Sequence, residues 1–241
     1  MKTFKSGHRR AQLVFVIFSI LIILSIISIV ILAIDIDIKN QVRQQIIDGE
    51  EVSSSEQNDS NDRVSLMGKI WMYTAIFSAI PFLLWLYVVH ANLSALGVKG
   101  LRFSTGDAVA WFFVPIFNLF KPYQVANEIW NGSNPNVPDD TDRTLDTCSS
   151  NAFIGHWWGY FLSTLIVAIF ALIVFRVNYG DYSDTWVGYI EYLEDFVYYR
   201  YWNIAFLFVA SVSFFATILF VRAVDRRQKA KHKLVGDLPI S

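Results

Sequence analysis

Residues 97–130 read GVKGLRFSTGDAVAWFFVPIFNLFKPYQVANEIW, and the number of membrane spans depends on how they fold. This stretch lies between long apolar runs and differs from them in being short and interrupted. Residues 108–120 form thirteen uncharged positions, whereas a helix that crosses the hydrocarbon core of a bilayer takes about 20 residues. We therefore predict that residues 108–130 form a re-entrant or interfacial segment and not a further span.

Local signals predict how this segment folds. Pro115 has no amide hydrogen to give to a helix, so we expect a break in the middle of the apolar run. Ser104 and Asp107 have the spacing of a capping box, which predicts the start of a short helix. Pro122 suits the first turn of a second short helix over residues 122–130, where its missing N–H has no use.

The order of residues in this stretch also carries a resemblance. The matching runs are NLSALG at 92–97, GLRFSTG at 100–106, WFFVPIFNLFKPYQ at 111–124 and EIW at 128–130. They resemble a bacterial membrane family described as domain of unknown function 4328. The chain departs from that pattern at Thr105, Asp107 and Ala110, where the family more often has a proline, an aromatic residue and a glycine. The resemblance implies a multi-pass bacterial membrane protein and supplies no activity.

Composition sets the broad class. Of the 241 residues, 54% are hydrophobic and 16% are aromatic, which is typical of a protein with several spans. A net charge of −1 argues against a broad nucleic-acid surface, which needs a basic excess. The single cysteine, Cys148, allows neither an internal disulfide nor a thiolate metal site. We expect one membrane domain with no nucleic-acid partner, no metal and no cofactor.

Four apolar runs are long enough to span a membrane as helices. The first follows a basic N-terminus and is too long for the apolar core of a cleaved signal peptide, so we interpret it as an anchor. We predict an all-α integral membrane protein with a basic N-terminus (1–10), a four-span membrane domain (11–222; spans 11–34, 70–89, 152–175 and 202–221) and a basic tail (223–241).

The stretches between the spans are polar. Residues 35–68 are mostly acidic and lack the apolar residues of a core, so we expect a solvated loop. The alternative is that the isoleucines at its start prolong the first helix or form a short amphipathic piece. Residues 178–200 are acidic and rich in tyrosine, and we expect an interfacial loop with a helical turn or two. Residues 132–150 form a third polar loop.

Charge predicts the orientation. Basic segments stay in the cytoplasm, so the basic N-terminus and tail belong on the same side, which requires an even number of crossings. Four spans put the two acidic stretches, with residues 50–60 and 181–195, outside. Aspartates in the loop 132–150 pull the other way, but acidic residues weigh little in this rule. We therefore expect both termini in the cytoplasm. Since the resemblance implies a bacterial membrane protein, the expected location is the bacterial cytoplasmic (inner) membrane.

No mechanism-bearing motif is present: there is no phosphate-binding Gly-rich loop, no H-E-x-x-H, no G-x-S-x-G and no cysteine pair. What remains is a set of polar residues that the topology gathers at the cytoplasmic membrane face. This polar cluster consists of His90, Asn92, Arg102, Asn118, Lys121, Tyr123, Gln124, Glu128 and His156.

Two interpretations of the polar cluster stay open. In the functional one, His90 and His156 flank the segment and share a small site with Asn118 and Gln124. In the structural one, each residue caps a helix, snorkels or anchors at the interface, and we favour it because interfaces collect such residues. We further expect Asn118, and also Gln124 or His156, to bond the backbone groups freed by the break.

The leading functional hypothesis is a non-catalytic scaffold or interaction protein that presents the re-entrant segment at the cytoplasmic face. The alternative is a small-molecule or lipid-binding carrier or permease subunit, and a membrane-embedded enzyme is the third. The expected partners are the lipid bilayer, anionic lipids in contact with the basic tail, and an unidentified membrane protein.

Overall fold

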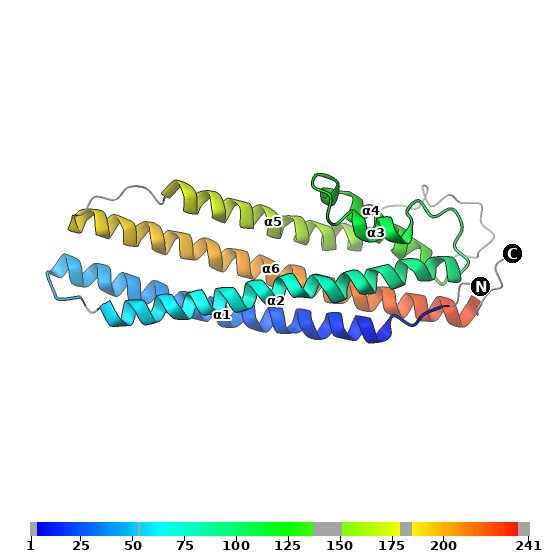
Figure 1. The fold of residues 1–241 in the computed structure, drawn as a ribbon, viewed down its shortest axis with the longest axis horizontal. Coiled ribbons are helices and arrows are strands. Elements are labelled where there is room, and N and C mark those ends of the chain that lie inside the picture. The colour runs from blue at the N-terminus through cyan, green and yellow to red at the C-terminus, as the bar shows by residue number, and fades with distance from the viewer. Residues whose placement is uncertain (1–3, 53, 137–150, 179–184, 236–241) are drawn as a thin grey trace. The chain divides into compact units, whose positions relative to one another are not determined.

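A computed structural model describes residues 4–52, 54–136, 151–178 and 185–235 (Figure 1). Over these residues the chain is helical and contains no strand, which confirms the all-α prediction. The elements are α1 (His8–Asp48), α2 (Ser54–Ala95), α3 (Thr105–Ala110), the 3-10 turn η1 (Phe117–Leu119), α4 (Lys121–Gly132), α5 (Ala152–Asn178) and α6 (Trp186–Val235).

Within the described residues, α1, α2, α5 and α6 are long and apolar enough to cross a membrane. This confirms the predicted four-helix membrane architecture. Three of the helices are longer than expected, with 41 residues in α1, 42 in α2 and 50 in α6. Because a span takes about 20 residues, each of these helices continues well beyond a hydrocarbon core.

The solvated loop expected over residues 35–68 is wrong for most of its length. Helix α1 continues to Asp48 and α2 already begins at Ser54. The prolongation has a packing reason, because Ile38 and Val42, one turn apart on α1, are buried in one apolar cluster with Leu193 of α6. The alternative, in which the isoleucines prolong the first helix, is confirmed.

The interfacial loop expected over residues 178–200 is likewise wrong from residue 186 onward. Helix α6 begins at Trp186, and its first turns pack Tyr189 and Tyr192 against the same apolar cluster. The rings of these two tyrosines stack with centroids 5.9 Å apart. Most of the third predicted polar loop, residues 137–150, lies outside the described residues, as do residues 179–184.

The chain divides into two compact units, and α1, α2, α5 and α6 each contribute to both. Unit 1 contains Met1–Ser19, Ile76–Gly159 and Phe215–Ser241, and therefore holds α3, η1 and α4. Unit 2 contains Ile20–Ala75 and Tyr160–Phe214.

The core of unit 1 is built around three aromatic side chains. Trp157 of α5 stacks on Phe220 of α6 with ring centroids 4.5 Å apart, and Trp85 of α2 meets Phe220 edge-on at 5.7 Å. Trp85 and Phe220 are fully buried. The Trp157 indole nitrogen donates to the Thr217 hydroxyl at 3.0 Å, so this tryptophan hydrogen-bonds within the core.

The core of unit 2 is organised by Trp71 of α2. Its ring meets Phe206 of α6 edge-on with centroids 5.3 Å apart. Its indole nitrogen donates to the Ser25 hydroxyl of α1 at 2.8 Å, and that hydroxyl in turn donates to the Leu21 carbonyl. One tryptophan therefore joins three helices of this unit by apolar contact and hydrogen bonds.

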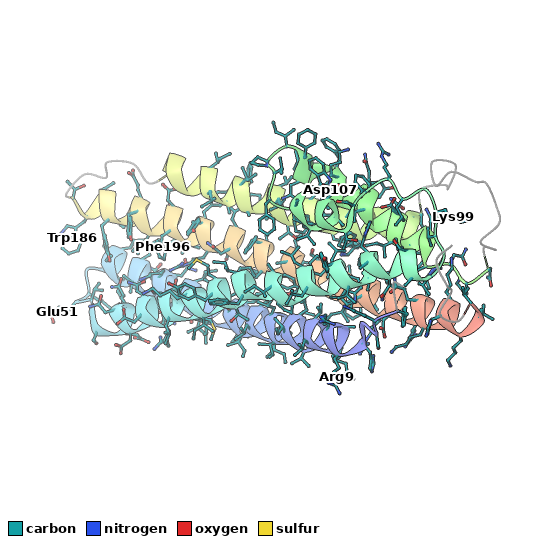
Figure 2. The ribbon with its side chains drawn as sticks, turned by 45° about the vertical axis from the view of Figure 1, so that its right-hand side comes forward. Arg9, Glu51, Lys99, Asp107, Trp186 and Phe196 are labelled. Carbon is teal, nitrogen blue, oxygen red and sulfur yellow. The ribbon has the colours of Figure 1, made fainter. Side chains whose placement is uncertain are left out.

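The local predictions for the central stretch are confirmed. Ser104 and Asp107 form a capping box at the start of α3: the Ser104 hydroxyl accepts from the Asp107 amide at 3.1 Å, and the Asp107 carboxylate accepts from the Ser104 amide at 3.2 Å. Asp107 is labelled on α3 in Figure 2. The helix breaks before Pro115, since α3 ends at Ala110. Helix α4 begins at Lys121, one residue earlier than predicted, with Pro122 in its first turn.

Candidate functional site

His90 and Glu128 form the centre of one polar network in unit 1. The His90 ring nitrogen Nε2 donates to Glu128 Oε2 at 3.0 Å, and both side chains are buried. The other ring nitrogen of His90 lies 3.4 Å from the Thr105 hydroxyl, and Glu128 Oε1 accepts from the Arg102 amide. These bonds tie α2 to α4 and to the loop before α3.

Asn92 forms a second network two residues further along α2. Its amide group exchanges two hydrogen bonds with the backbone of Lys5, at 3.0 and 2.9 Å, and donates a third to Gln228 at 3.1 Å. Gln228 of α6 in turn donates to the Val89 carbonyl at 2.7 Å and to the Ser133 hydroxyl at 3.2 Å. This network fastens the N-terminal segment and α6 to the ends of α2 and α4.

Lys121 lies among aromatic rings at the start of α4. Its ammonium group is 5.4 Å from the ring centroids of both Phe103 and Trp111, and 6.0 Å from that of Phe120. Such distances suit cation–π attraction. Because Trp111 begins the irregular part of the segment and Phe120 ends it, the lysine draws these two ends together.

Ile116 holds the most unusual backbone conformation in the described chain. Its φ of 67° and ψ of −55° are those of a γ-turn, closed by a hydrogen bond of 2.8 Å from the Phe117 amide to the Pro115 carbonyl. Among the described residues it is the only one other than glycine with a positive φ. A β-branched residue in this region is strained by about 1–3 kcal/mol, so the surrounding structure has to hold it there.

Large apolar side chains surround this turn and point outward. We call five of them the apolar tip, with exposed fractions from 41% at Phe117 and Phe120 to 74% at Ile116. The members of the apolar tip are Phe113, Ile116, Phe117, Leu119 and Phe120. A patch of this kind marks contact with lipid or with another protein.

Contacts with α2 and α5 hold the apolar tip in place. Phe112 points the other way from Phe113 and makes edge contacts with Phe82 of α2 and Trp158 of α5, at 5.8 and 6.5 Å. The Trp158 indole donates to the Leu119 carbonyl at 2.9 Å. The segment is therefore pinned to α2 at its beginning and to α5 near its end.

Most amides of the segment are satisfied locally. The backbone N–H groups of residues 112, 113 and 117 to 120 each donate to a carbonyl two to four residues earlier. An irregular backbone is tolerated at membrane depth only when its polar groups are paired or wet. These short-range bonds reduce the cost of bringing the segment into an apolar environment.

The hydrogen bonds expected from Asn118 and Gln124 are not formed. The side-chain oxygens of both residues are buried without a partner among the described residues, and so is the Trp111 indole nitrogen. The physical reason is that local turns already satisfy the freed backbone groups. His156, the third expected donor, is exposed and bonds the Ala152 carbonyl of its own helix at 2.6 Å.

The structure thus divides the polar cluster. One network contains His90, Arg102 and Glu128, and the other contains Asn92. Lys121 lies among the aromatic rings at the start of α4. His156 contacts its own helix, and Tyr123 is half-buried on α4, where its carbonyl accepts from Asn127. The two histidines, Asn118 and Gln124 are not joined by hydrogen bonds into the shared site of the functional interpretation.

Sequence reasoning missed Gln228 and Lys231, which complete the second network. Lys231 is buried and donates to the Gly132 carbonyl at 3.2 Å. A signal was present for Gln228, since it is an amide within a run of basic residues. Among the described residues, no group of three or more His, Cys, Asp or Glu side chains is placed to hold a metal ion.

Comparison with known proteins places the chain in one family. A family model described as Domain of unknown function (DUF4328) matches residues 48–226. No curated protein and no solved structure matches the chain. The matched range includes the apolar tip and both residues of the His90 and Glu128 pair.

Proposed function

The chain belongs to the DUF4328 family, and we propose that it is a non-catalytic membrane protein that presents the apolar tip to a membrane-embedded protein partner. The observation that carries this proposal is the exposure of five large apolar side chains around the strained turn at Ile116. Exposed apolar residues in the long helices are explained by lipid contact alone. Lipid contact alone does not explain why a strained turn holds apolar side chains outward, whereas contact with a specific partner does.

Preorganisation supports a binding role. Binding loses affinity when loops and side chains have to become ordered on contact. Here the segment is ordered beforehand by the Lys121 contacts, by the Trp158 hydrogen bond and by the His90 and Glu128 network beneath it. The tip therefore meets a partner without that cost.

The orientation is part of the proposal. The basic N-terminus and the basic tail support a cytoplasmic position for both termini, with the segment entering and leaving the inner membrane from the cytoplasmic side. Impermeant cysteine labelling in a Cys148→Ser background tests this. We expect labelling of intact cells at position 51 and labelling at position 230 only after permeabilisation.

The basic tail has a second proposed role in contacting anionic lipids. Several of its cations are engaged within the protein, since Arg227 lies 4.1 Å from the Trp130 ring centroid and Lys229 pairs with Asp225 at 2.8 Å. The exposed Arg226 and Lys233 are better placed for anionic headgroups. We expect these two to account for most of the contact.

A lipid-binding carrier or permease subunit is the alternative function, and an enzyme is the third. A carrier requires a cavity that the segment lines and a ligand that fills it. The buried, unpaired oxygens of Asn118 and Gln124 are the observation that favours it, because a ligand with donor groups would pair them. Under the leading proposal a bound water does the same.

Photo-crosslinking distinguishes these functions. A photoreactive amino acid at Ile116 should capture a protein in intact cells, and Phe113→Ser should abolish the product. The same reagent at Ile166 of α5, which is 66% exposed, is the matched control and should capture lipid only. Capture of lipid alone at both positions would reduce the tip to a membrane anchor and contradict the interaction role.

A further inference from the structure

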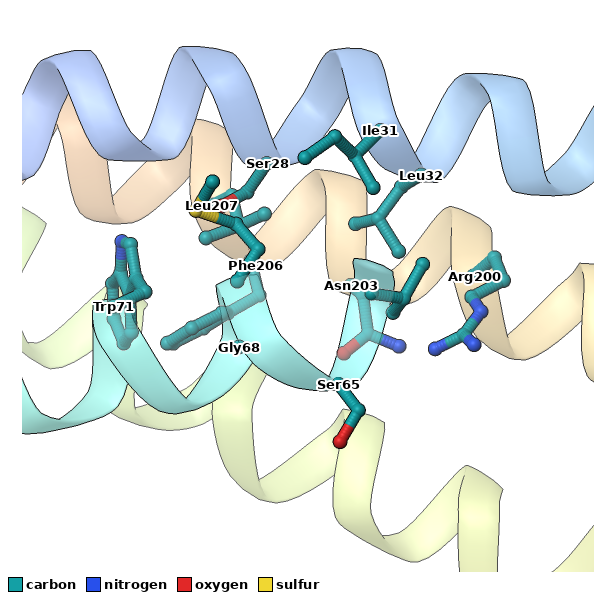
Figure 3. Close-up of a pocket in the computed structure, with 12 residues that line it drawn as sticks. Ser28, Ile31, Leu32, Ser65, Gly68, Trp71, Arg200, Asn203, Phe206 and Leu207 are labelled. Atoms are coloured by element: carbon teal, nitrogen blue, oxygen red, sulfur yellow. The ribbon is translucent and has the colours of Figure 1, made fainter. Parts of the chain in front are cut away.

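Unit 2 contains a cavity of about 270 Å³. It is lined by three helices of this unit, with residues 28–32 of α1, 64–71 of α2 and 200–207 of α6 (Figure 3). The segment 111–120 contributes nothing to its lining, so it is a feature separate from the apolar tip.

One end of the cavity is polar, and its polar groups are incompletely used. The ε-nitrogen of Arg200 donates a hydrogen bond to the Asp35 carboxylate at 2.8 Å. Within the described chain the two terminal nitrogens of Arg200 make no hydrogen bond. Figure 3 shows these nitrogens turned toward Asn203. The Asn203 side-chain oxygen and the Ser65 hydroxyl also lack a hydrogen bond to the described residues, and both residues line the cavity.

The charge at this end is positive. Asp35 is fully buried, and its second oxygen already accepts from the Ser60 hydroxyl at 2.7 Å. Lys39, also buried, and Arg200 both lie over the ring of Phe196, with Lys39 Nζ at 5.4 Å and Arg200 Cζ at 4.2 Å from its centroid. Arg200 lines the cavity, and Asp35 and Lys39 lie behind it, outside the lining. The positive charges of Lys39 and Arg200 are thus balanced by a single carboxylate, that of Asp35. Because an uncompensated buried charge is costly, the group favours an added anion.

The other end of the cavity is apolar. Phe206 and Leu207 contribute to its walls (Figure 3). The polar atoms that line this end are turned away from it, since Trp71 donates to Ser25 and the Ser28 hydroxyl donates to the Leu24 carbonyl at 2.7 Å. From residue 64 to residue 71 the helix rises by about 10 Å, which is room for a stretch of acyl chain.

The cavity opens on the side of α2. Gly68 lines it and is exposed, and a Cβ atom added there would meet nothing within 4 Å. Because Gly68 has no side chain, the wall of the cavity is open beside this position of α2, and this gap is the entrance. A larger residue could occupy the space without striking the backbone.

We propose that this cavity binds an anionic amphiphile, with its phosphate or carboxylate on Arg200 and the upper part of its chain against Phe206 and Leu207. The terminal nitrogens of a guanidinium match the paired oxygens of either group. An anionic phospholipid and a free fatty acid share this chemistry. The proposal is independent of the apolar tip and holds whether or not the tip binds a protein.

Binding is tested on the purified full chain in a neutral detergent by native mass spectrometry, with dioleoyl phosphatidylglycerol and oleate as probes. Dioleoyl phosphatidylcholine and oleyl alcohol are the matched probes without net negative charge. We expect one saturable site for at least one anionic probe, and binding at least about tenfold weaker for its matched control. Which anionic probe binds identifies the source of the amphiphile.

Variants locate the site. Gly68→Phe fills the entrance and should weaken binding about tenfold or more, whereas Gly68→Ala should change it less than about twofold. Arg200→Gln should weaken binding similarly, and Arg222→Gln, which removes an exposed arginine of unit 1, should not. If Arg200→Gln fails to fold, Gly68→Phe decides alone, because replacing a helical glycine favours the helix.

Three results would overturn the proposal. These are the absence of saturable binding for both anionic probes, equal binding of the matched controls, and unchanged binding in Gly68→Phe.

Discussion

Among the described residues, each unit buries one carboxylate that joins several helices, and the two carboxylates are used differently. In unit 1, Glu128 accepts from His90 and from the Arg102 amide, and the remaining nitrogen of His90 faces Thr105. In unit 2, Asp35 accepts from Ser60 and from Arg200, but the terminal nitrogens of Arg200 stay without a hydrogen bond among the described residues.

Unused hydrogen-bond donors and acceptors distinguish polar groups that bind a ligand from polar groups that support the fold, even where the sequence has no recognisable motif. A network whose donors and acceptors are all used has nothing to offer a ligand and serves the fold. A network that ends in unused donors beside a cavity can form hydrogen bonds to a ligand in that cavity. By this criterion we expect the His90 and Glu128 pair to support the segment and the Asp35 and Arg200 pair to form part of a binding site.

The largest effect is expected in the network of His90 and Glu128, which we call the closed network because its donors and acceptors are all used. Glu128→Leu leaves His90 and the Arg102 amide without their acceptor, so we expect a loss of about 2–5 kcal/mol in the free energy of unfolding. Thermal unfolding in detergent measures it. The double variant His90→Leu with Glu128→Leu should be less destabilised than the two single losses added together. A loss below about 1 kcal/mol in Glu128→Leu would show that the network does not support the fold.

The network of Asp35 and Arg200, which we call the open network because it keeps unused donors, should lose less free energy of unfolding when its carboxylate is replaced. Asp35→Asn keeps the shape of the side chain and an acceptor for Ser60, and water reaches part of the Arg200 side chain, which is 12% exposed. We therefore expect a loss of about 1–3 kcal/mol, below that of Glu128→Leu. Because the two cations remain and the carboxylate charge is gone, this variant should bind the anionic probe of unit 2 more tightly. Weaker binding of that probe by Asp35→Asn, measured by native mass spectrometry, would break the comparison.

A smaller effect is expected at Ile116, whose strain the closed network of unit 1 has to hold. Glycine adopts a positive φ without the steric cost of a β-branched residue but loses more entropy on folding. We expect Ile116→Gly to raise the free energy of unfolding by roughly 1 kcal/mol. Ile166→Gly within α5 is the control and should lower it by a similar amount. Destabilisation by Ile116→Gly would mean that the turn is not strained.

The smallest effect is expected at an ion pair of unit 2 that belongs to neither network. Arg43 and Glu194 lie 2.9 Å apart with side chains 36% and 54% exposed. Surface pairs of this kind contribute at most about 1 kcal/mol and are screened by salt. Arg43→Gln should therefore have little effect on thermal unfolding, and none at high salt. A loss comparable to that of Glu128→Leu would remove the distinction between buried and exposed pairs.

The sequence predicted what depends on local chemistry. The capping box of Ser104 and Asp107, the break before Pro115 and the helix that starts beside Pro122 follow from side chains within a few residues. The four long helices follow from the length of apolar runs. In each case the deciding residues are neighbours in the chain.

The rest depends on contacts between distant residues. The helical state of residues 35–48 depends on burial of Ile38 and Val42 against Leu193, about 150 positions away in the sequence. His90 meets Glu128 across 38 positions and Arg200 meets Asp35 across 165. Asn118 was misjudged for the opposite reason, because local turns satisfied the backbone that it was expected to serve.

We propose that the segment carrying the apolar tip enters the membrane and leaves it on the same side, and cysteine accessibility on the two flanks of the segment tests this topology. In a Cys148→Ser background, single cysteines at the exposed positions Gly106 and Asn136 are treated with an impermeant reagent before and after permeabilisation. We expect both positions to stay unlabelled in intact cells and both to be labelled once the membrane is permeabilised. Labelling of one position but not the other in intact cells would show a fifth crossing and contradict it.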